Sequence, residues 1–104
     1  MNQQTKTSVR LDLNNPVFQR QLLDLPKTDQ RNVLNTLRKL AHMSWEQVYI
    51  DHGLNWEAIL SRKGPKGSRL YSFRIGKGFG AVAYRQDSWL RLLSIHPDHD
   101  SAYH

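Results

Sequence analysis

The amino-acid sequence predicts an α+β fold: an N-terminal strand, an antiparallel helix hairpin and then an antiparallel β-meander, with the helices on one face of the sheet. Two observations carry this prediction. Apolar residues recur at helical spacing between residues 16 and 41, and they alternate or cluster in strand-length runs after residue 70. With 104 residues, the chain has room for one domain, spanning residues 1–104, and for a hydrophobic core.

The first strand and the first helix are marked by alternation, capping residues and proline. Apolar residues alternate with polar ones at the period of a half-buried strand: Val9, Leu11 and Leu13. Asn14 and Asn15 are good helix caps, and Pro16 suits the first turn that follows them. Four residues form the apolar side of this helix: Val17, Phe18, Leu22 and Leu25. Pro26 ends it.

A second helix is expected to begin at Thr28 or Asp29 and to end near residue 41. Its apolar stripe follows helical spacing: Val33, Leu34, Leu37, Leu40 and Ala41. The short turn between the two helices is typical of an antiparallel pair. The pattern weakens over residues 42–59, where we expect a helical turn near Trp45, a break at Gly53 and a strand starting at Trp56.

Three further strands are expected after a polar loop at residues 61–68, which contains glycine and proline. The strands cover residues 71–75, 81–84 and 89–95, and residues 76–78 and 86–88 suit the two hairpin turns between them. Pro97 ends the third strand at His96, because proline cannot donate a hydrogen bond to a sheet.

Composition excludes several classes of protein. The chain has no cysteine, which removes disulfides, thiolate catalysis and cysteine-rich metal sites. Its longest apolar run, residues 79–84, is far shorter than the roughly 20 residues that span a bilayer. Residues 1–8 are polar, so we expect no secretory signal there and expect this segment to fray.

Basic residues are concentrated in the second half of the chain. The formal net charge is +6, and residues 62–91 alone hold eight Lys or Arg against the single acid Asp87. A small domain with its charge concentrated in this way is typical of a protein that binds a polyanion, and nucleic acid is the commonest soluble one. The alternative is a basic loop that only keeps the protein soluble.

Strand alternation predicts where several of these cations point. If Phe73 faces the helices, its neighbours Ser72 and Arg74 face the other way. The opposite face would then be concave and basic, with four cations on or near it: Lys66, Arg69, Arg74 and Arg91. Arginine can hold phosphate oxygens bidentately, so such a face suits a nucleic-acid backbone. For any one of these arginines, the alternative is an ion pair with a carboxylate or a position over a Trp ring.

The C-terminal segment, residues 96–104, carries three of the five histidines: His96, His99 and His104. Their spacing matches no zinc signature, so a metal site is the weakest interpretation. General acid–base catalysis is a second interpretation, because histidine titrates near neutral pH. A solvated terminus with a fortuitous cluster is the third.

The last 35 residues contain three recognisable segments: LYSFRI (70–75), FGAVAYR (79–85) and WLRLLSIHPDHD (89–100). They resemble the RelE/ParE superfamily of bacterial toxins, and the order of helix pair, tryptophan-containing segment and meander is also the order of that family. The resemblance implies a RelE-like, microbial-RNase-like fold and a type II toxin–antitoxin toxin that cuts messenger RNA in the ribosomal A site. It implies a cognate antitoxin, the ribosome and mRNA as partners, the bacterial cytoplasm as location, and no metal, cofactor or membrane.

In the reaction that the resemblance implies, a ribose 2′-hydroxyl attacks the adjacent phosphate, which needs a base, an acid and cations. The resemblance assigns Arg74 as the phosphate clamp, His96 or His99 as the proton-transfer residue, and Tyr103 as a base-stacking group or acid. Further phosphate contacts are expected from six basic residues: Lys63, Lys66, Arg69, Lys77, Arg85 and Arg91.

One position departs from the family pattern. The family commonly has an arginine directly after the aromatic residue of the second segment, where this chain has Gly80. Loss of one preorganised donor typically costs about 10²- to 10³-fold in rate. Either Lys77 or Arg85 replaces the missing cation, or a one-residue alignment gap hides it, or the protein is weakly active. Two alternatives therefore stay open: a ParE-like poison of DNA gyrase, and a basic nucleic-acid-binding module with little catalytic activity.

Overall fold

The structure is a computed structural model that describes residues 7–97. Its elements follow the chain in this order: β1 (Arg10–Asp12), α1 (Pro16–Asp24), α2 (Lys27–Ala41), α3 (Trp45–Ile50), β2 (Glu57–Lys63), the 3₁₀ turn η1 (Pro65–Gly67), β3 (Arg69–Gly76), β4 (Phe79–Gln86) and β5 (Trp89–His96). The predicted α+β class and the order of its elements are confirmed. None of the helices within residues 7–97 combines the length and the apolar character needed to cross a bilayer.

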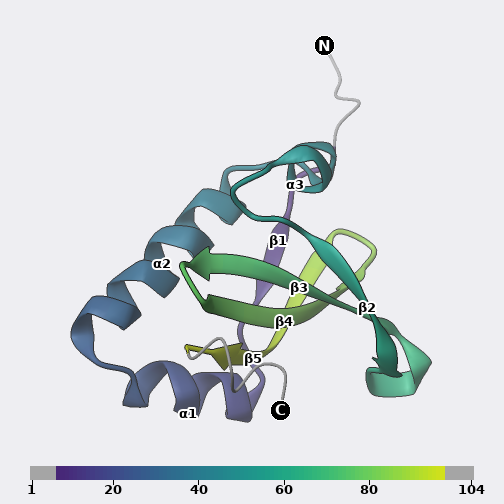
Figure 1. The fold of residues 1–104 in the computed structure, drawn as a ribbon. Helices are drawn as coiled ribbons and strands as arrows, with labels where there is room; N and C mark the ends of the chain where they lie inside the picture. The colour runs from purple at the N-terminus through teal and green to yellow at the C-terminus, as the bar shows by residue number, and fades with distance from the viewer. Residues whose placement is uncertain (1–6, 98–104) are drawn as a thin grey trace.

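One five-stranded sheet forms the centre of the molecule, in the order β1-β5-β4-β3-β2 (Figure 1). Strands β2 to β5 form the expected antiparallel meander. The short β1 adds to the other edge of β5 in parallel, with Arg10 opposite Trp89 and Asp12 opposite Arg91. The sheet is therefore mixed, because the chain between β1 and β5 returns to the same end of the sheet before β5 begins.

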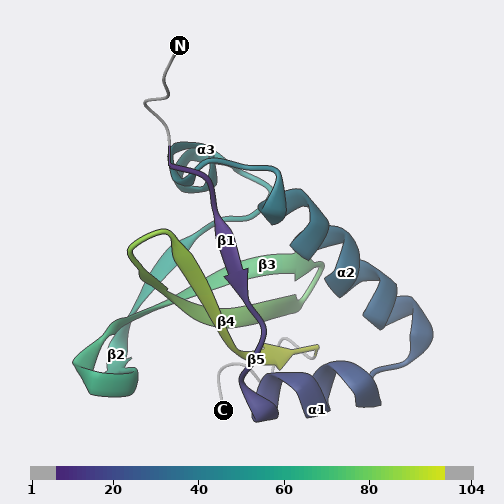
Figure 2. The same cartoon turned by 180° about the vertical axis from the view of Figure 1, so that it is seen from behind.

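Helices α1 and α2 pack on the sheet, and both views show them diverging from the turn that joins them (Figures 1 and 2). The expected helix pair is present, and its two helices diverge because α1 lies against β5 while α2 lies against β1 and β3. Asn15 caps α1 as predicted: its side chain accepts hydrogen bonds from the backbone N–H groups of Val17 (2.8 Å) and Phe18 (3.3 Å). α2 begins at Lys27, one residue before the predicted range.

The core lies between these helices and one face of the sheet. It contains the buried residues of all layers: Val9, Phe18, Val33, Leu37, Leu40, Trp45, Val48, Leu54, Phe73, Phe79, Ala81, Ala83, Leu90, Leu92 and Ile95. Three residues that helical spacing placed on apolar faces are instead exposed, namely Val17, Leu34 and Ala41. Each lies on the side of its helix that the sheet does not cover.

The segment after α2 forms the short helix α3, which closes one end of the core. A reciprocal capping box begins it, since the Ser44 side chain accepts from the Gln47 N–H while the Gln47 side chain accepts from the Ser44 N–H. Thr7 and Ser8, which we expected to fray, are held against this helix start. The Trp45 N–H donates to the Thr7 carbonyl (2.8 Å), and Ser8 forms a bridge with Ser44.

Two irregularities in strand pairing decide which side chains reach the uncovered face of the sheet. In β5, Val82 pairs with Ser94 and Ala83 with Leu92, so Leu93 is an extra residue. This bulge lets Leu92 and Ile95 both face the core, while Ser94 and His96 face away from it. In β2, Ile59 pairs with Leu70 and Lys63 with Arg69, which leaves three β2 residues without partners.

The β2–β3 hairpin projects beyond the body of the sheet, on the side away from α2 (Figures 1 and 2). We call residues 60–69 the arm. Its turn is well ordered by backbone hydrogen bonds from Gly64 to Ser68 (2.8 Å), from Gly67 to Gly64 (3.1 Å) and from Ser68 to Pro65 (3.0 Å). β2 extends to Lys63, so the expected loop at residues 61–68 is shorter than predicted.

Candidate active site

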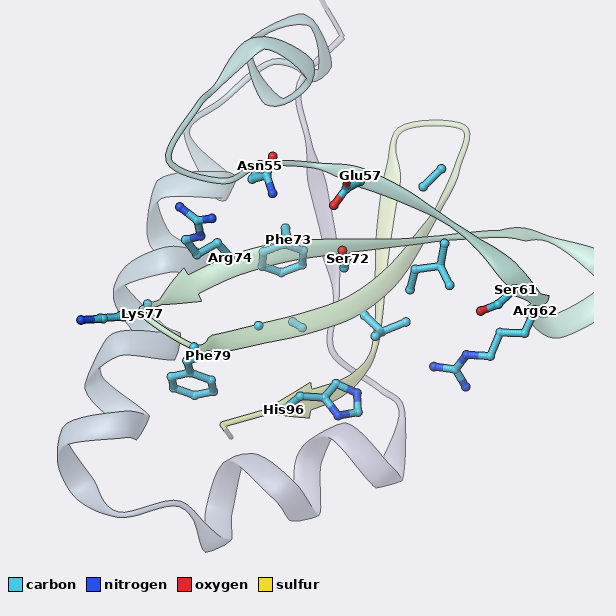
Figure 3. A pocket seen from close by; sticks show the side chains of 17 residues that line it. Asn55, Glu57, Ser61, Arg62, Ser72, Phe73, Arg74, Lys77, Phe79 and His96 are labelled. Atoms are coloured by element: carbon cyan, nitrogen blue, oxygen red, sulfur yellow. The ribbon is translucent and has the colours of Figure 1, made fainter. Parts of the chain in front are cut away.

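The sheet face opposite the helices is hollowed into a groove of about 1080 Å³. Figure 3 shows the side chains that line it. The polar and charged lining residues come from the β2 region, β3, the β3–β4 turn and β5: Asn55, Glu57, Ser61, Arg62, Ser72, Arg74, Lys77 and His96. Phe79, Val82 and other apolar or glycine positions make the floor. An exposed groove with cations, one carboxylate and one imidazole can bind a polyanion and move protons.

The register of the sheet sets two rows of residues across this groove. In the first row, Arg74 of β3 pairs with Gly80 of β4, and Gly80 pairs with His96 of β5. Directly opposed residues share one face of a sheet, so Arg74 and His96 flank a position without a side chain. In the second row, Glu57, Ser72, Val82 and Ser94 follow one another over four strands. Figure 3 shows Glu57 and His96 on opposite walls.

Arg74 is fixed from the side of the loop before β2. Its backbone N–H donates to the Leu54 carbonyl (2.7 Å). Leu54 is itself fixed, because its N–H donates to the Asp51 carboxylate (2.8 Å), and Asp51 forms an ion pair with Lys39 of α2 (3.1 Å). The Leu54 N–H in the first place, and Lys39 in addition, hold the pKa of Asp51 below its ordinary value against the opposing effect of burial. The Arg74 end of the groove is thus tied to α2.

His96 lies at the end of β5, where two contacts hold it. Its Nε2 is 3.0 Å from the Ser94 hydroxyl, and the Gln21 side chain of α1 accepts from the Ile95 N–H (2.7 Å). Partial burial lowers the pKa of His96 below its ordinary value, and the positive charge of Arg62 lowers it further. The imidazole is therefore mainly neutral at neutral pH and is a stronger acid than a free histidine when it is protonated.

Of the ten residues that the sequence singled out, three line this groove: Arg74, Lys77 and His96. Lys63, Lys66 and Arg69 lie on the exposed arm. Arg69 belongs to the other face of β3 from Arg74, because the two residues are five positions apart and successive side chains of a strand alternate between its faces. The single basic face that we expected is therefore divided between the groove and the arm.

Arg85 and Arg91 contact other side chains of the protein: Arg85 lies over a Trp ring, and Arg91 forms an ion pair with a carboxylate. The Arg85 guanidinium lies over the ring of Trp45 (4.4 Å to its centre) and donates to the Tyr49 hydroxyl (2.6 Å). Arg91 pairs with Asp12 and lies 5.6 Å from the centre of the Trp89 ring. Arg85 therefore does not supply the cation that Gly80 lacks, and both residues connect elements of the fold.

His99 and Tyr103 lie outside the described residues, so their expected roles stay predictions. Within residues 7–97, no three His, Asp or Glu side chains gather as a metal-ligating group. Two charged groove residues were not among the expected site residues, Glu57 and Arg62. Arg62 belongs to the basic segment of residues 62–91, but no local motif indicates that either side chain faces His96.

Comparisons with known proteins support the fold. The structure is similar to a chain in the crystal structure of the archaeal RelE–RelB complex from Pyrococcus horikoshii OT3, with a TM-score of 0.58 and 19% sequence identity. The similarity covers 89% of this chain and 96% of that chain. No protein-family model and no curated protein sequence matches this chain. The chain thus has a RelE-like fold, as the C-terminal sequence segments implied.

Proposed function

We propose that this protein is the toxin of a type II toxin–antitoxin pair and acts as a ribosome-dependent mRNA endoribonuclease. The observation that carries the proposal is the groove itself. It brings one arginine, Arg74, onto one sheet face with two groups that can transfer protons, Glu57 and His96. The RelE-like fold and the basic charge of residues 62–91 support it.

The positions of Glu57 and His96 suit an in-line displacement at phosphorus. In such a reaction the attacking and the leaving oxygen lie on opposite sides of the phosphorus, so the base and the acid must also lie on opposite sides. Neighbouring strands are about 4.8 Å apart, so three strand spacings separate the backbones of the two walls by about 14 Å. Side chains reaching inward from both walls leave room for one phosphate between them.

The proposed reaction uses only groups of the protein and of the RNA. The Glu57 carboxylate takes the proton of the ribose 2′-hydroxyl while O2′ attacks the phosphorus, and the bond from phosphorus to O5′ breaks. Protonated His96 gives its proton to O5′. The products are a 2′,3′-cyclic phosphate and a 5′-hydroxyl end. The guanidinium of Arg74 stabilises the negative charge that builds on the non-bridging oxygens, and the reaction needs no metal ion or cofactor.

The role of His96 as acid follows from charge. In the proposed reaction Glu57 acts as the base, which leaves the imidazole of His96 as the acid. In the protein without RNA, partial burial and Arg62 lower the pKa of His96. A bound phosphate brings negative charge next to the ring and favours the protonated form.

A cognate antitoxin is part of the proposal, since a toxin that cuts translated mRNA must be masked in its own cell. RelE of Pyrococcus horikoshii was crystallised in complex with RelB. In this chain, large apolar side chains are exposed on α1 and α2, namely Val17 (56%), Leu23 (74%) and Leu34 (55%). They offer an apolar surface on which an amphipathic antitoxin segment can fold.

The test adds the purified protein to a bacterial cell-free translation reaction and maps new 5′ ends on the mRNA, with and without ribosomes. We expect cuts at codon-phased positions that require ribosomes. The double variant Arg74→Ala/His96→Ala should lose them, while Arg31→Ala, an exposed cation on α2, should keep them. An intact message would refute the nuclease proposal, and inhibition of gyrase supercoiling by the same preparation would then favour the ParE-like alternative.

A further inference from the structure

We propose that Arg62 is a second phosphate-contacting cation of the groove, and that the bulge in β2 delivers it. The inference rests on the proposed function and adds a residue to it. In this arrangement Arg62 and Arg74 contact the phosphate on which His96 acts from opposite ends of the groove. Arg62 thereby supplies the positive charge that Gly80 does not.

The bulge explains why Arg62 points into the groove rather than along the arm. Between the pairs Ile59–Leu70 and Lys63–Arg69, β2 has three residues while β3 has none. Such an insertion bends its strand and redirects the side chains within it. Two of the three inserted residues, Ser61 and Arg62, line the groove, whereas the side chain of the first, Leu60, is 79% exposed. The bulge thus directs Ser61 and Arg62 into the groove and leaves the apolar side chain of Leu60 in solvent.

The position of Arg62 relative to His96 fits a shared phosphate. Figure 3 shows the Arg62 side chain extending from the arm toward His96, across the groove from Arg74. The charge of Arg62 lowers the pKa of His96, as expected of a cation that faces the imidazole. Within residues 7–97 the ion pairs are Lys39–Asp51 and Arg91–Asp12, so Arg62 has no carboxylate partner there. Its guanidinium can therefore bind an anion.

Gly80 makes the place for that anion. It lies between Arg74 and His96 in the first cross-strand row, and its lack of a side chain leaves the sheet bare at that point. An arginine there would bring its charge from the floor of the groove. In this chain Arg62 of β2 supplies the charge from the wall of the groove instead. One guanidinium at each end of the groove can contact the non-bridging oxygens of the phosphate backbone, which develop additional charge in the transition state.

The experiment compares Arg62→Gln and Arg62→Lys with the wild type, and uses Arg31→Gln on α2 as the matched loss of one exposed charge. Three quantities are measured: the pKa of His96 by NMR, the affinity for an RNA oligonucleotide with 2′-O-methyl riboses, and the rate of ribosome-dependent cleavage. We expect Arg62→Gln to raise the pKa of His96, to weaken RNA binding about tenfold or more, and to lower kcat about 10²-fold.

The lysine variant should recover part of the affinity and of the rate, because it restores the charge without the bidentate geometry. Arg31→Gln should change none of the three quantities. If Arg62→Gln leaves the pKa of His96 and the RNA affinity unchanged while the wild type cuts mRNA, the role of Arg62 is overturned and the proposed function stands. If the wild type does not cut mRNA, the nuclease proposal fails, and the pKa and affinity still decide whether Arg62 binds phosphate beside His96.

Discussion

Gly80 lies at the centre of the proposed binding site and contributes no side chain to it. It lies in β4 with Arg74 on one side and His96 on the other, and the space above it is part of the groove. A Cβ added there would lie 3.2 Å from the Phe73 carbonyl oxygen, which is tighter than an ordinary contact. A larger residue would therefore both press on β3 and fill the space between the two site residues.

We predict that Gly80→Val abolishes RNA binding while the protein stays folded. The valine methyl groups would occupy the place of the phosphate, and overpacking of this kind costs about 1–3 kcal/mol of stability. Affinity for the 2′-O-methyl oligonucleotide and the thermal midpoint together check the prediction. Gly80→Ala is the matched control, since it makes the contact with the Phe73 carbonyl but adds little bulk. Equal loss of binding in both variants would show that backbone strain, not blockage, is the cause.

His96 makes a second residue-scale prediction, on the pH dependence of cleavage. Burial and Arg62 lower the pKa of this imidazole. His96 therefore loses its proton at a lower pH than an ordinary histidine does. If His96 is the acid, kcat should fall as the pH rises through its pKa in the bound complex. Arg62→Gln should move this alkaline limb to higher pH even though it lowers the maximal rate. A rate that instead rises through the same interval would assign His96 as the base.

At the scale of elements, the link between α2 and the groove runs through Asp51. This carboxylate accepts from the Leu54 N–H and pairs with Lys39, and the Leu54 carbonyl then accepts from the Arg74 N–H. Both backbone polar groups of Leu54, its N–H and its carbonyl, are therefore hydrogen-bonded, and they hold the loop before β2 in place. Glu57, the proposed base, is the first residue of β2 and lies three positions after Leu54.

Replacing Asp51 should therefore affect stability and the site together. We expect Asp51→Ala to destabilise the protein by about 1 kcal/mol, which corresponds to a decrease of about 4–8 °C in the thermal midpoint of a small domain. Asp51→Asn keeps an acceptor for the Leu54 N–H and should cost less. Urea unfolding of both variants measures the difference. Equal stability of Asp51→Ala and wild type would show that the loop does not depend on this carboxylate.

Local sequence patterns predicted those helices and strands whose position depends only on residues within the same element. Asn15 capped α1 and the meander strands fell where alternation placed them, because caps and periodicity act within a few residues. The parallel pairing of β1 with β5 joins residues far apart in sequence. The bulge that turns Arg62 inward lies in the β2–β3 hairpin, but it depends on the register between the two strands, which alternation along one strand does not specify. No local pattern encodes them, which is why Arg62 and Glu57 were not assigned to the site.

The same difference explains the fates of the predicted cations. Arg74 was placed in the groove by strand alternation alone, which the structure keeps from Tyr71 to Arg74. Arg85 and Arg91 have equally basic side chains, but their neighbours Trp45, Tyr49 and Asp12 come from elements before the meander. Tertiary contacts of this kind decide whether an arginine binds a ligand or the protein itself.

At the scale of the whole molecule, two aspartates make folding sensitive to acid. The pKa of Asp12 is lowered chiefly by the N–H of Asn14 and also by Arg91, while burial opposes the shift. The pKa of Asp51 is also lowered, chiefly by the N–H of Leu54 and in addition by Lys39. Each carboxylate therefore stabilises the folded state when it is ionised. That contribution is complete above the aspartate pKa of the unfolded chain, about 3.9, and is lost as the pH falls through the lower pKa of the folded state.

We accordingly predict that the free energy of unfolding decreases as the pH falls through the ordinary histidine range, because His96 takes up a proton more readily in the unfolded chain. It decreases further below about pH 4, where the two aspartates are protonated. Both carboxylates join distant parts of the chain, Asp12 linking β1 to β5 and Asp51 linking α3 to α2. Urea unfolding at a series of pH values measures the slope. The double variant Asp12→Asn/Asp51→Asn should be less stable at pH 7 and should lose much of the acid dependence, since neither site can then release or bind a proton. An undiminished slope in that variant would assign the acid sensitivity to other carboxylates.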